Sequence, residues 1–183
     1  MNTIAAISTA TGNGGIGIIR MSGDNCFNIL EKIFRTKNNK KINIEKIEGY
    51  TIKYGFIINT EKNEIIDEVL VSFFKNPKSY TRENMCEINS HGGMIVEKRI
   101  LEECIKNGAT LAEPGEFTKR AFLNGRIDLS QAESIIDIIN SKTEKEAKAS
   151  VNQLKGYLSE NIEKIRHQLL DLMADIEANI DYP

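Results

Sequence analysis

The chain has 183 residues, with 24 Lys and Arg against 26 Asp and Glu, so its formal net charge is −2. Hydrophobic residues make up 40% of the chain and charged residues 27%, which is the balance of an ordinary globular protein. The slightly negative charge argues against a broad electropositive surface and against non-specific nucleic-acid binding, while a local basic patch stays open.

The three cysteines, Cys26, Cys86 and Cys104, are widely spaced and contain no CxxC pair. Their odd number does not suit a disulfide framework, and no metal-ligand spacing occurs, so buried free thiols in a reducing compartment and no metal site are expected. The sequence has no apolar leader segment and no long apolar run. We therefore expect a cytoplasmic protein without a signal peptide or a membrane contact.

The first part of the chain alternates short β-rich runs with turns. Five runs predict strands, because they are rich in β-branched residues or alternate polar and apolar residues. They are residues 3–8, 16–21, 50–59, 65–75 and 83–89. Apolar residues at helical spacing predict one helix that begins near Ser22 and ends near Arg35, and another that begins at 90–93 and ends at Asn107-Gly108. The lysine-rich segment 36–48 is predicted to be a solvated loop rather than a nucleic-acid-binding arm.

The sequence changes character at Pro114-Gly115, after which nearly all of it is predicted to be helical. The predicted fold is α+β: a mixed-sheet domain with two flanking helices over residues 1–118, then an all-α segment over 119–183. The predicted helices of this second part are 116–123, 130–139 and one long helix from Ser141 or Thr143 to about Ile180. Ser130 is the predicted N-cap of the middle helix, with Glu133 at the capping-box position.

The long helix carries an apolar seam with alternating steps of four and three residues, typical of helix pairing. Its members are Leu158, Ile162, Ile165, Leu169, Leu172 and Ile176. Such a seam needs a neighbour, which is either a helix of the same domain or another chain, unless truncation leaves the seam bare.

A glycine-rich turn, Gly12-Asn13-Gly14-Gly15, precedes the apolar run that contains Arg20. Gly12-x-Gly14-x-x-Gly17 matches a dinucleotide fingerprint, but a strand is predicted to follow it where that motif needs a helix. The glycines therefore indicate a turn between strands or the close approach of a ligand or second subunit. Arg20, within an apolar strand, should face an internal carboxylate or an anionic ligand.

Three further side chains are candidates for chemistry. Glu87 is either a solvent-facing residue or a pocket carboxylate, able to accept the paired N–H donors of a pterin ring. Arg126 either forms a surface pair with Asp128, as Arg120 would with Glu116, or contacts an anion such as the glutamate tail of a folate. His91 is catalytic, a dimer contact or a helix cap. Catalysis is the least supported role, because no Cys or carboxylate lies at nucleophile-activating spacing.

Several motifs together resemble the N-terminal region of the MnmE (TrmE) family of tRNA-modification GTPases, over essentially the whole chain. They are Gly14-Gly-Ile-Gly-Ile-Ile-Arg-Met-Ser-Gly23, Ser79-Tyr-Thr-Arg-Glu83, Ser90-His-Gly-Gly93, the run from Ala112 to Glu133, and Ile180-Asp-Tyr-Pro183. The run from 112 to 133 is the most specific of these.

The resemblance implies a domain similar to the folate-binding domain of the glycine-cleavage T-protein. In this family that domain binds 5-formyl-tetrahydrofolate, or 5,10-methylene-tetrahydrofolate as a one-carbon source, and forms a homodimer. With an FAD-dependent partner, MnmG, the family modifies C5 of the wobble uridine of tRNA. The folate-contacting positions carry over to Arg20, Glu87 and Arg126, where some relatives have lysine in place of Arg126.

The resemblance also shows what this sequence lacks. It has no GxxxxGK[ST] motif, so no GTP hydrolysis by that route is expected, and the family's GTP, Mg and K sites fall outside this chain. The family's C-terminal Cys-x-Gly-Lys motif is absent as well. The stop at Pro183 is expected to be a truncation, and the helices that follow the GTPase domain are the expected neighbours of the apolar seam. Two alternatives remain: a dimerisation scaffold without a working folate site, and a stand-alone folate enzyme that uses His91.

Overall fold

The computed structural model describes residues 2–10, 12 and 14–181. Asn13 of the glycine turn, and Tyr182 and Pro183 of the last motif, lie outside the described residues. The chain forms two compact units, Met1–Arg126 and Ile127–Pro183.

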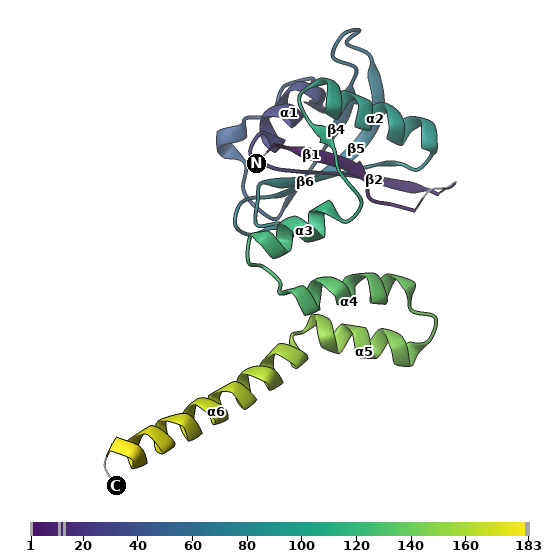
Figure 1. Ribbon diagram of the computed structural model, residues 1–183. Helices are drawn as coiled ribbons and strands as arrows, with labels where there is room; N and C mark the ends of the chain where they lie inside the picture. Colours follow the sequence, from purple (N-terminus) through teal and green to yellow (C-terminus); the bar gives the residue numbers. More distant parts are fainter. Residues whose placement is uncertain (1, 11, 13, 182–183) are drawn as a thin grey trace. The chain divides into compact units, whose positions relative to one another are not determined.

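The first unit is built on one mixed seven-stranded sheet in the order β3-β4-β5-β6-β2-β1-β7 (Figure 1). Neighbouring strands are antiparallel, except that β7 runs parallel to β1. The strands are β1 (Ile4–Ile7), β2 (Ile16–Ser22), β3 (Phe34–Thr36), β4 (Thr51–Ile58), β5 (Ile65–Phe74), β6 (Met85–His91) and β7 (Thr110–Leu111).

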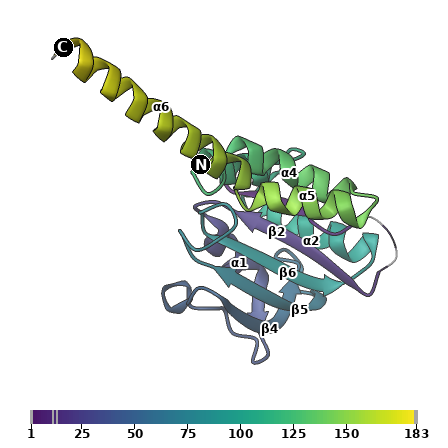
Figure 2. The same cartoon turned by 90° about the horizontal axis from the view of Figure 1, so that it is seen from below.

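Three α-helices and a short 3-10 turn accompany this sheet. They are α1 (Cys26–Ile33), α2 (Met94–Lys106), α3 (Glu116–Leu123) and η1 (Ile44–Lys46). Helices α1 and α2 pack against one face of the sheet and form the hydrophobic core with it (Figure 2). Alternate residues of each strand enter this core, as the two-residue period of a strand requires: Ile19 and Met21 from β2, Cys86 and Ile88 from β6.

The opposite face of the sheet, which we call the open face, carries the other half of each strand. Its strand register places Arg20, Glu87, Ser72 and Ile52 side by side in one row across β2, β6, β5 and β4. This row therefore mixes charged, polar and apolar side chains on a single surface, and it contains two of the three predicted site residues.

The second unit consists of three helices, α4 (Leu129–Asn140), α5 (Glu144–Leu154) and α6 (Tyr157–Asp181). All six residues of the apolar seam on α6 are between 47% and 58% exposed. The seam is thus present as predicted and is not covered by α4 or α5. None of the helices in the described part of the chain combines the length and the apolar character that a membrane span requires.

The predicted α+β fold with a following helical segment is confirmed, but some local predictions were wrong. The strands β3 and β7 were not predicted, because each has only two or three residues. The single long helix is divided into α5 and α6 at Gly156, whose φ of 88° is unfavourable for residues with a side chain. The N-cap of α4 is Asp128, which forms a capping box with Gln131, and not Ser130.

The boundary between the compact units falls between Arg126 and Ile127, whereas the predicted domain boundary lay at 118/119. Helix α3, which that boundary cuts, is held to the first unit through Arg120. Its guanidinium donates to the backbone oxygen of Asn2 and to the carboxylate of Glu83. An all-helical composition after residue 115 gave no sign of this attachment.

Candidate functional site

Arg20 and Glu87 form the centre of the candidate site. They are directly opposite each other on β2 and β6, and both point to the open face. Arg20 donates from Nε and Nη2 to the same carboxylate atom, Glu87 Oε1, at 2.9 and 2.7 Å. The side chains are 27% and 20% exposed, so the pair is partly desolvated and reachable. The carboxylate that Arg20 was predicted to face is therefore Glu87.

Two aromatic rings enclose the guanidinium of Arg20. Its Cζ lies 5.4 Å from the ring centroid of Tyr80 and 5.5 Å from that of Phe117. Arg126 contacts the same Tyr80 ring, with its Cζ 4.8 Å from the centroid. Cations at these distances are attracted by the negative faces of aromatic rings. The two arginines are thus brought together through one tyrosine, although they are far apart in the sequence.

Tyr80 is held in place by hydrogen bonds between its loop and α3. Its hydroxyl shares a 2.9 Å hydrogen bond with the hydroxyl of Thr118. Asn124 donates its side-chain N–H to the backbone oxygen of Thr81 at 2.6 Å, and Arg82 donates to the backbone oxygen of Asn124 at 3.0 Å. Arg82 has a φ of 57°, the left-handed region that ordinary residues seldom adopt. Contacts to α3 therefore fix both the loop and the ring it carries.

Below this loop, Arg120 anchors α3 in a buried charged network. It is 4% exposed and bonds to Glu83, 8% exposed, and to Glu116. Glu83 also accepts from the hydroxyl of Ser22 at 2.7 Å. The pair of Arg120 and Glu116, considered from the sequence as a surface pair, does form at 2.8 Å, but it is largely buried and not on the surface.

The site thus has two guanidinium groups and one carboxylate, arranged around one aromatic ring. Glu87 uses only Oε1 for Arg20, and no donor in the described part of the chain bonds to its Oε2. Arg126 is exposed and has no carboxylate partner among the described residues. The cluster can therefore accept hydrogen bonds at Glu87 Oε2 and bind a negative charge at Arg126.

The structure brings the three predicted residues, Arg20, Glu87 and Arg126, into one cluster. Sequence reasoning missed Tyr80 and Phe117. Both were within the motifs quoted above, and an aromatic residue next to a Thr in each motif was the available signal. It could not be read as a site because the ring–cation contacts join segments that are about 40 to 100 residues apart.

His91 is the last residue of β6, four residues from Glu87, and does not reach the arginine cluster. At about 3.3 Å per residue this separation is about 13 Å. Its Nδ1 lies 2.8 Å from Asp67 Oδ1, and its backbone N–H donates to Asp67 Oδ2. The hydrogen bond to Asp67 raises the pKa of His91 above its usual 6.5. Because α2 begins at Met94 with Gly93 as N-cap, His91 is not a helix cap.

The glycines of the first motif contact the protein's own chain. A Cβ at Gly92 would overlap the backbone oxygen of Gly14, and a Cβ at Gly17 would overlap the buried carboxylate of Glu97. Gly92 also donates its N–H to the backbone oxygen of Gly15. These contacts explain Gly17 and Gly92 without a ligand. The strand that follows the turn confirms that the motif is not a dinucleotide fingerprint.

The three cysteines are free and buried, as predicted. In the part of the chain that the structure describes, no cluster of three or more His, Cys, Asp or Glu side chains has the geometry of a metal site.

Fold and site together define a protein in which an α+β unit, with a cluster of charged and aromatic side chains on it, precedes a helical unit in the sequence. Residues 3–126 match the family model described as "GTP-binding protein TrmE N-terminus", and residues 129–183 match the "MnmE helical domain". The chain therefore belongs to the MnmE (TrmE) family.

Similar proteins described as "tRNA modification GTPase MnmE" occur in several bacteria. The chain is 59% identical over 182 residues to that of Acetivibrio thermocellus, and 50% identical over 182 residues to that of Lactiplantibacillus plantarum. That of Alkaliphilus metalliredigens is 52% identical over 181 residues. These matches cover 99–100% of this chain but only 38–39% of the relatives' length.

Proposed function

We propose that the first unit binds a reduced folate, 5-formyl-tetrahydrofolate or 5,10-methylene-tetrahydrofolate, at the cluster of Arg20, Glu87 and Arg126. The supporting observation is that the three charged residues predicted from the sequence lie in one cluster. Arg20 and Arg126 both contact the Tyr80 ring, and Arg20 is hydrogen-bonded to Glu87. A folate combines a flat ring bearing N–H donors with a tail of carboxylates. The cluster offers a matching acceptor, an aromatic ring and cations.

Each residue has a distinct role in this proposal. Glu87 Oε2 accepts from the amino and ring N–H groups of the pterin, while Oε1 stays with Arg20. Arg20 holds the Glu87 carboxylate in its orientation, because its guanidinium donates from two nitrogens to Oε1. Arg126, which is exposed and not paired with a carboxylate in the described residues, binds the glutamate tail.

Calorimetry with Arg126→Ala separates the tail contact from the ring contact. The variant should bind 5-formyl-tetrahydrofolate about tenfold more weakly, because a charged hydrogen bond contributes about 1.5–3 kcal/mol and this one is exposed. A ligand without the glutamate tail should bind the variant and the unchanged chain equally. Equal losses for both ligands would contradict the role given to Arg126. A chain that self-associates but gives no heat with either ligand would favour the scaffold alternative.

We also propose that two copies of the chain associate through the open face of the sheet. Four large apolar side chains are exposed there: Ile16 (67%), Ile52 (66%), Leu70 (48%) and Tyr54 (41%). A sheet face turned to solvent is usually polar, and clustered apolar groups on it mark an interface. A second copy is the occupant that this surface suits, because the same patch on both copies gives a closed two-fold interface.

Sedimentation of Leu70→Asp tests this interface. A buried, unpaired carboxylate at its centre should shift the chain from dimer to monomer at micromolar concentration. Ile105→Asp is the matched control, because Ile105 is a 39% exposed residue of α2 on the opposite side of the sheet. If both variants remain dimeric, the open face is not the interface.

The relatives' name, "tRNA modification GTPase MnmE", supports a role in tRNA modification that uses GTP, which we propose for the protein as a whole. We propose further, from the family resemblance, that the folate serves the C5 modification of the wobble uridine of tRNA. In the same proposal GTP hydrolysis requires Mg and K, and the partner is an MnmG-type FAD-dependent protein. These 183 residues contain no P-loop, so the GTP-dependent steps would fall to other residues. Three buried free thiols support a reducing compartment, the cytoplasm.

A further inference from the structure

A concentration of positive charge lies on the segment from Lys32 to Ile44. It contains five basic residues and no Asp or Glu, in a chain whose net charge is −2. The basic residues are Lys32, Arg35, Lys37, Lys40 and Lys41. The four lysines are exposed, and none of them forms an ion pair within residues 2–10, 12 and 14–181. Their charges are therefore available to an external anion.

The fold places these charges at the free edge of the sheet. Strand β3 is the outermost strand on that side, so its second edge has no neighbouring strand. A tight turn follows β3, in which the backbone N–H groups of Lys40 and Asn39 bond to Thr36. Lys37 and Lys40 thus belong to a compact turn, and Lys41 follows it directly.

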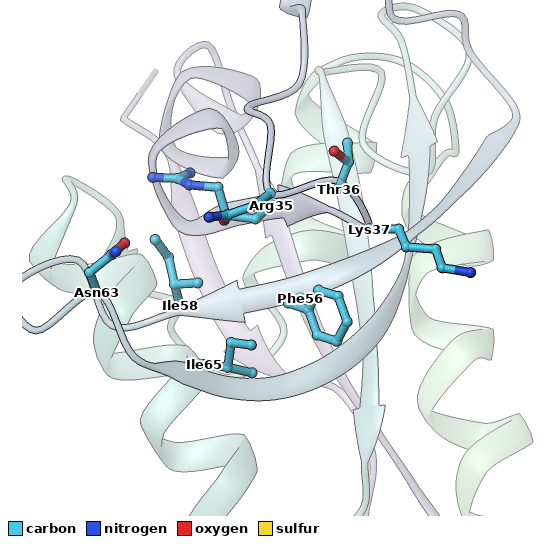
Figure 3. Close-up of a pocket in the computed structure, with 8 residues that line it drawn as sticks. Arg35, Thr36, Lys37, Phe56, Ile58, Asn63 and Ile65 are labelled. Atoms are coloured by element: carbon cyan, nitrogen blue, oxygen red, sulfur yellow. The ribbon is translucent and has the colours of Figure 1, made fainter.

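A hollow of about 210 Å³ lies beside this turn, between β3, β4 and β5 (Figure 3). Its apolar part is formed by Phe56, Ile58 and Ile65. Thr36, Asn39 and Asn63 add hydroxyl and amide groups, and Arg35 and Lys37 add charge. Figure 3 shows Phe56 and Ile65 close together, and Lys37 extending outward, away from the Phe56 ring. Since small-molecule pockets usually measure about 300–1,000 Å³, this hollow suits one ring rather than a whole cofactor.

Arg35 is held firmly at the rim of the hollow. Its Nη1 donates to the backbone oxygens of Glu31, Lys32 and Phe34, at 3.1, 2.9 and 2.8 Å. It therefore fixes the end of α1 to β3 and supplies a stationary positive charge. On the far side the surface ends at Glu68, opposite Phe56 on β5 and hydrogen-bonded to Tyr54. The positive region is thus confined to the β3 side.

We propose that this surface, made of Arg35, Lys37, Lys40, Lys41 and the hollow at Phe56, binds a single-stranded nucleic acid. The Phe56 ring is half-buried and packs edge-on against Tyr54, so one side of it is reachable from the hollow. Lysines on a turn next to a reachable aromatic ring and amide groups are what a strand with phosphates and unstacked bases requires. One base stacks at Phe56, the amides of Asn39 and Asn63 bond to its edge, and the lysines bind the adjacent phosphates. An anionic membrane would use the charges but would leave the ring and the amides without a role.

The lysine-rich segment alone predicted a solvated loop, and the hollow beside it is what changes that interpretation. The proposal does not depend on folate binding, since no residue is shared between the two sites. Its failure would therefore leave the folate proposal unaffected.

The test is fluorescence anisotropy of the 183-residue chain with a labelled single-stranded RNA of about 12 nucleotides, within the usual site size of about 4–16. Lys37→Glu/Lys40→Glu/Lys41→Glu should weaken binding by at least about tenfold. It should also reduce the slope of log affinity against log salt by about 2, because each phosphate contact contributes about 0.7. The control is Lys142→Glu/Lys145→Glu/Lys148→Glu, the same charge change on lysines of the second unit.

Two substitutions separate stacking from charge. Phe56→Leu should weaken binding by at least about fivefold without changing the salt slope, the lower end for one stacked base. Phe56→Tyr, which keeps the ring, should bind like the unchanged chain, and this rescue shows that a loss in Phe56→Leu is not a folding defect. The proposal is overturned if the unchanged chain does not bind the RNA, or if duplex RNA binds better than the single strand. It is also overturned if the control loses as much RNA affinity as the variant with all three β3-side lysines replaced, or if Phe56→Leu binds the RNA as tightly as the unchanged chain.

Discussion

Arg120→Ala should destabilise the first unit strongly, because it removes the centre of a buried network of charges. Arg120 is 4% exposed and neutralises Glu83, 8% exposed, and Glu116. Removing one partner of a buried ion pair costs about 3–5 kcal/mol, since the other charge is left without compensation. Glu83 keeps the hydroxyl of Ser22, and Glu116 keeps the N–H of Glu113, so the lower end, about 3 kcal/mol, is expected.

Hydrogen exchange of the most protected amides of β2 and β6 measures this loss in the first unit alone. A loss of about 3 kcal/mol is about two powers of ten in the opening equilibrium. Arg166→Ala is the control, because Arg166 pairs with Glu163 on the surface, at 63% and 49% exposure, and should change stability by less than about 1 kcal/mol. If Arg120→Ala and Arg166→Ala have equal effects, the network around α3 does not hold the unit together.

Three smaller predictions concern caps, titration and steric fit. Hydrogen bonds from the Ser159 hydroxyl and from the N–H of Gln131 lower the pKa of Asp128 below its usual 3.8. The stability that ionised Asp128 contributes is therefore complete above pH 3.8 and is lost as pH falls through the lower folded pKa. Acid denaturation of Asp128→Ala should lack this component. NMR titration should give His91 a pKa above 6.5 that returns toward 6.5 in Asp67→Asn, and its contribution to stability is present below 6.5 and lost as pH rises through the folded value. Gly92→Ala should lower the free energy of unfolding by about 1–3 kcal/mol, because the added Cβ would overlap the backbone oxygen of Gly14. Gly15→Ala is the control and should change the free energy of unfolding far less, because a Cβ at Gly15 would meet open space.

Much of the fold could be predicted from the sequence, because long β-branched runs and helical periodicity are local signals. The five long strands and the helix Glu116–Leu123 follow from such patterns. The strands β3 and β7 could not, since strands this short are defined by their neighbours in the sheet. The cap at Asp128 was missed because Ser130 with Glu133 also fits the capping-box spacing.

The candidate site was predictable in part. Arg20 stood out as a charge within an apolar strand and Glu87 as a carboxylate between two apolar residues, and the structure shows that they are cross-strand partners. Tyr80 did not stand out, because its role depends on two arginines that approach it from β2 and from the end of the first unit. Local patterns identify unusual residues, but only the folded chain shows which of them meet.

Calorimetric titration with 5-formyl-tetrahydrofolate, of the unchanged chain and of Glu87→Gln, tests the central proposal most directly. Glu87→Gln keeps the shape of the side chain but removes the charge that pairs with Arg20 and accepts the pterin N–H groups. Glu68→Gln, on the same face of the sheet, is the control. The proposal predicts one folate per chain and at least about tenfold weaker binding for Glu87→Gln alone. No heat with the unchanged chain, or equal affinity in all three proteins, would contradict it.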